Sequence, residues 1–79
     1  MRVLLFAHLK DAIGAAEFEI KLSEPAGVDG LWHELIVAHP PLAKFRRTTR
    51  LARNGEYATA TTFFLDADEV ALIPPVSGG

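Results

Sequence analysis

Asp68-Glu69-Val70-Ala71-Leu72-Ile73-Pro74-Pro75-Val76-Ser77-Gly78-Gly79 closes this 79-residue chain and leads an apolar strand through two prolines into a diglycine. Proline fixes φ and has no N–H to donate, so Pro74 and Pro75 keep the segment extended and out of a sheet ladder. Glycine lacks a Cβ atom, so Gly78 and Gly79 make the end thin and accessible. We therefore expect residues 74–79 to form a flexible, extended tail that presents the terminal carboxylate.

Three segments are expected to form the strands that flank or precede this tail. Val70–Ile73 is apolar throughout, which is typical of a strand in the centre of a sheet. Residues 2–7 form a second apolar run, and residues 17–22 alternate between apolar and charged side chains as a half-buried strand does. Residues 8–15 are expected to form a loop that contains a helical turn.

One amphipathic helix is expected after the second strand. Apolar residues recur with the spacing of one helix face at Val28, Leu31, Trp32, Leu35 and Ile36. Trp32 is the expected anchor of this helix on the sheet. Pro40 disfavours helical backbone at His39, so the helix should end there.

The dipeptide Asn54-Gly55 is a strong hairpin signal. Residues 50–54 and 57–60 are expected to be short strand pieces on either side of it, after a basic connector of uncertain structure at residues 42–49. The apolar cluster Phe63-Phe64-Leu65 leads into a turn before the last strand. The order reads ββαββ, which predicts one α+β domain over residues 1–79 with the helix packed on a mixed sheet.

Composition narrows the class of protein. The chain has no cysteine, which excludes disulfides and thiolate metal sites. The net charge is −2 and the isoelectric point is about 5.8, which argues against general nucleic-acid binding. The N-terminal apolar run is too short to span a membrane or to serve as a secretory signal. We expect a soluble, cytoplasmic protein that binds neither membrane nor nucleic acid.

Several charged groups have alternative interpretations. The basic residues between Lys44 and Arg53 could bind nucleic acid, but a solvated surface or one that steers a partner fits better because Phe45 is the only aromatic residue among them. Asp66, Asp68 and Glu69 are expected to form a solvated turn, because the fuller calcium-loop pattern is missing. No metal site is expected, since His8, His33 and His39 lack ligand spacing and suit surface or helix-end positions.

The order of elements and the C-terminal run resemble the ubiquitin-like β-grasp family, and within it the small subunit of molybdopterin synthase. Residues 68–79 are similar to that family's C-terminal signature, of which Pro-Pro-Val-Ser-Gly-Gly is the most specific part. Residues 3–11 with Gly14 fit its first strand and loop, and Asn54-Gly55-Glu56-Tyr57 fits its central turn. The resemblance covers the whole chain.

Two positions depart from the family pattern. Ala67 stands where glycine is usual between the acids of the last turn, which could tighten or alter that turn. Arg53 stands before Asn54, where an apolar residue is expected. Neither position lies in the tail, so the chemistry that the resemblance implies for the tail is unaffected.

The resemblance implies a non-catalytic sulfur-donor subunit with no catalytic side chain of its own. An E1-like adenylating enzyme would use ATP to form an acyl-adenylate on Gly79, and a sulfurtransferase carrying a persulfide would convert it to a thiocarboxylate. The large subunit of molybdopterin synthase, as part of a heterotetramer, would receive the tail and pass its sulfur to a cyclic pyranopterin during molybdenum cofactor synthesis. The inserted residues would be Pro74, Pro75, Val76, Ser77 and Gly78. No permanently bound cofactor is implied.

The resemblance also implies an apolar contact patch at Phe6, Tyr57 and Ile73. The alternative is that Phe6 and Ile73 are core residues of adjacent strands, although strand alternation must place some of these side chains outward.

Three other functions stay open at this point. The chain could carry sulfur for thiamine, cysteine or tRNA thiolation. It could be a ubiquitin-like modifier whose Gly79 forms isopeptide bonds with lysines. It could also be an interaction module with an inert tail.

Overall fold

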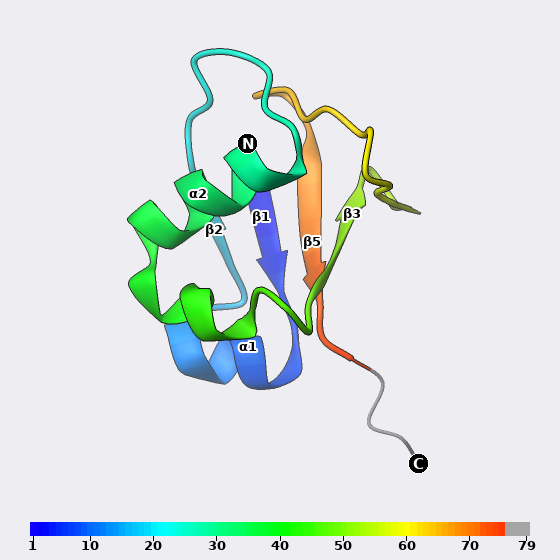
Figure 1. The fold of residues 1–79 in the computed structure, drawn as a ribbon. Helices are drawn as coiled ribbons and strands as arrows, with labels where there is room; N and C mark the ends of the chain where they lie inside the picture. Colours follow the sequence, from blue (N-terminus) through cyan, green and yellow to red (C-terminus); the bar gives the residue numbers. More distant parts are fainter. Residues whose placement is uncertain (76–79) are drawn as a thin grey trace.

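The computed structural model describes residues 1–75, which are built on a five-stranded mixed sheet (Figure 1). Its strands follow the order β2-β1-β5-β3-β4 across the sheet. Their bounds are Arg2–Leu5 for β1, Glu17–Glu19 for β2, Arg50–Arg53 for β3, Glu56–Tyr57 for β4 and Glu69–Ile73 for β5. The prediction that the last strand is central is confirmed.

Strand β5 has a strand on each side along most of its length, since β1 pairs with residues 69–72 and β3 with residues 70–73. It runs parallel to β1, with Leu5 opposite Leu72, and antiparallel to β3, with Leu51 opposite the same residue. Parallel neighbours require a long crossover connection. Here most of the chain, from the end of β1 to the start of β5, forms that connection.

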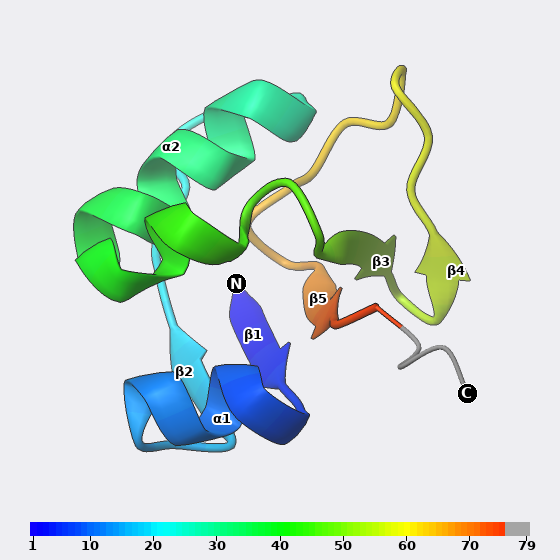
Figure 2. The same cartoon turned by 60° about the horizontal axis from the view of Figure 1, so that its bottom comes forward.

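One face of the sheet is covered by helix α2, Val28–Ala38, and by the 3-10 helix η1, Pro40–Phe45 (Figure 2). Helix α2 ends with His39 as its cap residue, directly before Pro40, as predicted. The apolar spacing that predicted the helix places Leu31, Trp32 and Leu35 in the interior. The 3-10 helix occupies part of the connector at residues 42–49, whose structure the sequence left uncertain.

The prediction of a loop with a helical turn after β1 is wrong in extent. Ala7–Ile13 forms the α-helix α1, which contacts η1 and ends at Gly14 with φ 84°. Within α1, Leu9 is fully buried, whereas Lys10 and Asp11 are exposed to solvent. A helix this short shows little apolar periodicity, because it rests on the core through few side chains.

The hairpin between β3 and β4 has the predicted turn. Asn54 and Gly55 both have positive φ, 48° and 88°, as a type I′ turn requires. Strand β4 is shorter than the expected 57–60. The chain turns away after it, where the Thr59 amide donates to the Thr62 hydroxyl at 2.9 Å.

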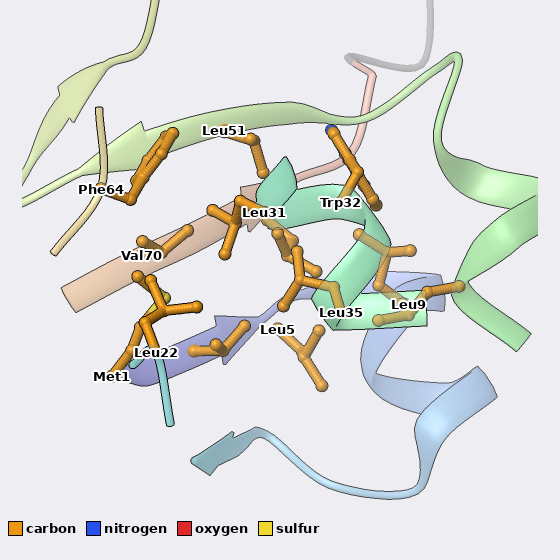
Figure 3. Packing of buried hydrophobic residues seen from close by; sticks show 13 residues of the cluster. Met1, Leu5, Leu9, Leu22, Leu31, Trp32, Leu35, Leu51, Phe64 and Val70 are labelled. Carbon is orange, nitrogen blue, oxygen red and sulfur yellow. The ribbon is translucent and has the colours of Figure 1, made fainter. Parts of the chain in front are cut away.

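The core lies between the covered face of the sheet and the helices (Figure 3). Val3, Leu5, Val70 and Leu72 enter it from the sheet, and Trp32, 3% exposed, anchors α2 as predicted. In the cluster at residues 63–65, Phe64 alone is buried, while its two neighbours are exposed. This arrangement of helices on one face of a mixed sheet is the α+β β-grasp fold that the sequence predicted.

Candidate partner-binding site at the root of the tail

The tail begins where the central strand ends. Ile73 is the last residue of β5, Pro74 is half-buried and Pro75 is exposed. Arg50 pairs with Ile73, and Leu5 pairs with Leu72 from the other side. The root of the tail is therefore fixed by two neighbouring strands. The sequence predictions for Val76, Ser77, Gly78 and Gly79 concern positions outside the described residues.

The face of the sheet opposite the helices carries a shallow apolar hollow of about 320 Å³. Strand alternation turns Leu4 of β1, Ala52 of β3 and Ala71 of β5 toward this face. Ala52 pairs with Ala71, so two alanines lie side by side at the bottom of the hollow. Their side chains are small, which leaves space above them for a partner's side chain. We call this surface the outer hollow; it is lined by Leu4, Phe6, Ala52, Gly55, Tyr57, Glu69, Ala71 and Ile73.

The three residues predicted as a contact patch all line the outer hollow. Phe6 is 45% exposed and Tyr57 is 56% exposed, while Ile73 is half-buried. Phe6 and Ile73 thus lie outside the helix-covered core, contrary to the alternative interpretation. The structure brings the three together although they come from the N-terminal, central and C-terminal parts of the chain.

Arg50 links the outer hollow to the root of the tail. Its guanidinium carbon lies 3.9 Å from the centre of the Tyr57 ring, a cation–π geometry. Since Arg50 also pairs with Ile73, its side chain is held at the edge of the hollow nearest the tail. Nothing in the sequence pattern predicts this contact.

The opposite edge of the hollow is polar and charge-paired. Arg2 binds Glu17 and also approaches Glu69, with Nη1 3.3 Å from Oε2. The hydrogen bond and charge of Glu17 are the main reason why the pKa of Arg2 is raised further above its usual value. Glu69, which lines the hollow, is therefore engaged by a cation.

A side-chain network fixes the start of β5. The Asn54 amide donates to Asp68 Oδ1 at 2.9 Å, and its Oδ1 accepts the Glu69 N–H at 2.9 Å. Asp68 also accepts the Leu65 N–H at 2.8 Å, and this bond is the main reason why the pKa of its carboxyl is lowered. Ala67 lies in this turn without positive φ, so the alanine that departs from the family pattern carries no left-handed strain.

Of the other groups that the sequence singled out, Asp66, His8 and His39 have structural contacts, whereas His33 is exposed on α2. Asp66 accepts the Leu22 N–H at 2.8 Å and the Met1 ammonium at 3.3 Å, and both bonds lower the pKa of its carboxyl. His39 packs on Phe18 with ring centres 4.2 Å apart, and His8 packs on Phe45 at 5.3 Å. Among residues 1–75, no three His, Asp or Glu side chains gather as metal ligands. No helix in that range is long and apolar enough to cross a membrane.

The site is suited to docking rather than to side-chain catalysis. Its lining is apolar except for Tyr57, which is covered by Arg50, and Glu69, which is paired with Arg2. An exposed apolar hollow with aromatic residues at its edge is typical of a protein–protein contact. The hollow adjoins the strand from which the tail leaves, so a protein bound there would lie beside the tail.

Sequence reasoning missed the floor of the hollow, which is formed by Leu4, Ala52 and Ala71. The signal was available for β5, because Ala71 and Ile73, two and four positions after Glu69, share the outer face when Val70 and Leu72 point inward. The sequence contains no such signal for Ala52, because its pairing with Ala71 determines the face of the sheet on which its side chain lies.

Comparison with known proteins gives consistent matches over nearly the whole chain. The sequence model of the ThiS family matches residues 3–79. The molybdopterin synthase sulfur carrier subunit of Chlamydomonas reinhardtii is 37% identical, over 100% of this chain and 98% of the relative. The subunit of the same name from Arabidopsis thaliana is 34% identical, over 100% of this chain and 82% of the relative.

Among solved structures, the chain is similar to SAMP1, the small archaeal modifier protein 1 of Haloferax volcanii. The TM-score is 0.82 and the sequence identity is 31%, over 99% of this chain and 97% of that structure.

Proposed function

The chain belongs to the ThiS family, and on that premise we propose that it is the sulfur carrier subunit of a molybdopterin synthase. The observation that carries this proposal is the place at which the tail begins. A central strand, held on both sides, ends beside an exposed apolar hollow and continues into Pro-Pro-Val-Ser-Gly-Gly. The two relatives described above, both named as sulfur carrier subunits, support it over the full length of the chain.

The chemistry proposed for Gly79 takes place on its backbone carboxylate. A carboxylate is a poor electrophile, so a partner enzyme first activates it: one oxygen attacks the α-phosphate of ATP, and pyrophosphate leaves. A persulfide sulfur from a sulfurtransferase then attacks the acyl carbon and AMP leaves; reductive cleavage of the S–S bond by a thiol leaves a thiocarboxylate on Gly79. This sequence needs no acid or base from the carrier.

Receipt of the tail by a large synthase subunit is the second part of the proposal. Phe6, Tyr57 and Ile73 would contact that subunit around the outer hollow, while Pro74, Pro75, Val76, Ser77 and Gly78 enter its active site with Gly79. Prolines lower the entropy that is lost when such a segment is captured. The sulfur would pass to a cyclic pyranopterin, so no permanently bound cofactor is proposed for the carrier itself.

Mass spectrometry of the intact protein tests the proposal. After incubation with its adenylating enzyme, ATP and a persulfide donor, we expect the mass increase of one oxygen-to-sulfur exchange, located on Gly79 by fragmentation. Deletion of Gly79 should abolish the exchange, whereas Ser77→Ala, which keeps the diglycine, should allow it. Normal exchange without Gly79 would contradict the proposal.

A protein modifier is the alternative that the comparison with SAMP1 favours. In that case Gly79 would form isopeptide bonds with lysines of other proteins. Arg53 is the last basic residue, so tryptic digestion of cell extracts would leave residues 54–79 attached to a modified lysine. A mass-spectrometric search for such remnants, in cells with and without this gene, would detect the bond. A carrier that serves only the synthase should leave no such remnants and should restore pyranopterin conversion when it is added to the large subunit.

A further inference from the structure

A basic segment lies beside the point at which β5 ends. Figures 1 and 2 show residues 46–49 running past the end of β5 before β3 begins, and Arg50 pairs with Ile73 there. Arg53 lies at the other end of β3, opposite Val70, and is separate from this group. We call the cations of η1 and of the segment that leads from it into β3 the basic rim: Lys44, Arg46, Arg47 and Arg50.

Most of the basic rim is available to a partner. Arg46 is engaged, since its Nη2 lies 2.6 Å from Asp29 Oδ1. Within residues 1–75, no carboxylate lies within ion-pair distance of Lys44, Arg47 or Arg50, and all three are exposed. Arg50 is held over Tyr57, so its charge lies at the edge of the outer hollow.

The opposite end of β5 carries three carboxylates, two of which have cations beside them. Asp66, Asp68 and Glu69 lie in or next to the turn at which this strand begins. Asp66 is paired with the Met1 ammonium and Glu69 with Arg2, so the charge at this end is largely compensated. The charges of Lys44, Arg47 and Arg50 are not compensated in this way among residues 1–75, and a group of uncompensated charges orients a protein in the field of its partner before contact.

The length of the tail indicates what the basic rim faces when a partner receives it. Residues 74–79 span at most about 20 Å when fully extended. If the extended tail enters an active site that lies about 20 Å below the partner's surface, the rim stays outside and faces the protein surface around the entrance. Bound ATP or pterin would lie beyond the reach of the rim side chains.

We infer that the basic rim steers the tail toward its receiving enzymes, and that these enzymes carry carboxylates around the entrance that receives the tail. This inference rests on the proposed function, because it requires partners that take up the tail. An acidic protein surface fits better than a nucleic acid, because the rim adjoins an apolar hollow and belongs to a chain with negative net charge.

Association kinetics with the large synthase subunit encoded in the same genome test the inference. We expect the association rate of the unaltered carrier to fall by about tenfold between about 20 mM and about 500 mM salt. At the lower salt concentration, Arg47→Glu should slow association several-fold and change the dissociation rate little. Lys21→Glu makes the same charge change on an exposed residue remote from the rim, and should leave association nearly unchanged.

Three results would overturn the inference. The first is equal association rates for the carrier and Arg47→Glu at low salt. The second is an equal loss with Lys21→Glu, which would reduce the effect to net charge. The third concerns tRNA binding: if Arg47→Glu associates with the large subunit as fast as the unaltered carrier but binds tRNA more weakly than it, the rim is a nucleic-acid surface. If the unaltered carrier fails to bind the large subunit at any salt concentration, the proposed function falls, and the inference with it.

Discussion

The guanidinium of Arg50 covers the ring of Tyr57, with its central carbon 3.9 Å from the ring centre. The two residues lie on neighbouring strands β3 and β4, and Arg50 is also paired with Ile73 of β5. This contact orders an aromatic side chain that is 56% exposed. Tyr57 is thus presented to a partner with less side-chain entropy to lose than a freely rotating ring would have.

Truncation of Tyr57 should weaken binding to the large synthase subunit. Tyr57→Ala removes an aromatic side chain from the edge of the outer hollow and should raise the dissociation constant by about tenfold or more. Tyr57→Phe keeps the ring beneath Arg50 and should bind nearly as well. Isothermal titration calorimetry measures both. Phe63→Ala is a matched control, because Phe63 is 62% exposed but does not line the hollow, so an equal loss there would contradict the prediction.

Replacement of Asn54 should destabilise the fold through two separable effects. Asn54→Ala loses the bonds to Asp68 and Glu69 and places alanine at φ 48°, so we expect a loss of about 2–3 kcal/mol in the free energy of unfolding. Asn54→Gly accepts this φ and loses only the hydrogen bonds, so its loss should be smaller. Urea titration followed by circular dichroism measures both, and equal losses would show that backbone strain plays no part.

Stability should fall in acid because of the turn before β5. The carboxyl of Asp68 has a lowered pKa in the folded protein, and so has that of Asp66. The unfolded chain therefore takes up protons first as the pH falls. The stabilisation from both groups is complete above their unfolded pKa of about 3.9 and is lost as the pH falls through the folded values.

Asp68→Asn tests this pH dependence. Its oxygen can still accept the Leu65 N–H, but its charge is gone, so the free energy of unfolding should change less between about pH 5 and about pH 2. Thermal unfolding at a series of pH values is the measurement. The same slope in the variant and the unaltered protein would show that Asp68 does not contribute.

Helix α2 should gain stability from a single alanine. Gly30 lies inside the helix, and an added Cβ would meet the Ala26 Cβ at 3.5 Å, an ordinary contact. Gly30→Ala should raise the free energy of unfolding by about 0.5–1 kcal/mol and the melting temperature by several degrees. Gly55→Ala is the opposite control, because φ is 88° there and alanine should destabilise the hairpin. A loss of stability with Gly30→Ala would contradict the prediction.

The sequence predicted the parts of the fold that rest on local pattern. The spacing from Val28 to Ile36 located α2, Asn54-Gly55 located the type I′ turn, and the apolar run at residues 70–73 located the central strand. Helix α1 was underestimated because Leu9 is its only fully buried residue and its stability depends on contact with η1. Tertiary contact outweighed a weak local signal there.

The sequence predicted three members of the candidate site, but it predicted neither the floor of the hollow nor the contacts between strands. Phe6, Tyr57 and Ile73 follow from the family resemblance, and they do line one hollow. The stacking of Arg50 on Tyr57 and the bonds from Asn54 to the start of β5 join residues on different strands, so their partners depend on sheet order and register. Short-range sequence pattern carries no information on such pairs.

The central position of β5 also bears on how the protein is made. A ribosome synthesises β1 and β3 before the strand that must pair with both. A nascent chain that stops before Glu69 leaves these two strands with exposed edges and an incomplete core, so it should remain unfolded and be open to proteolysis. Chains that are truncated before β5 should therefore not accumulate as folded protein, and every folded molecule should extend at least to the root of the tail.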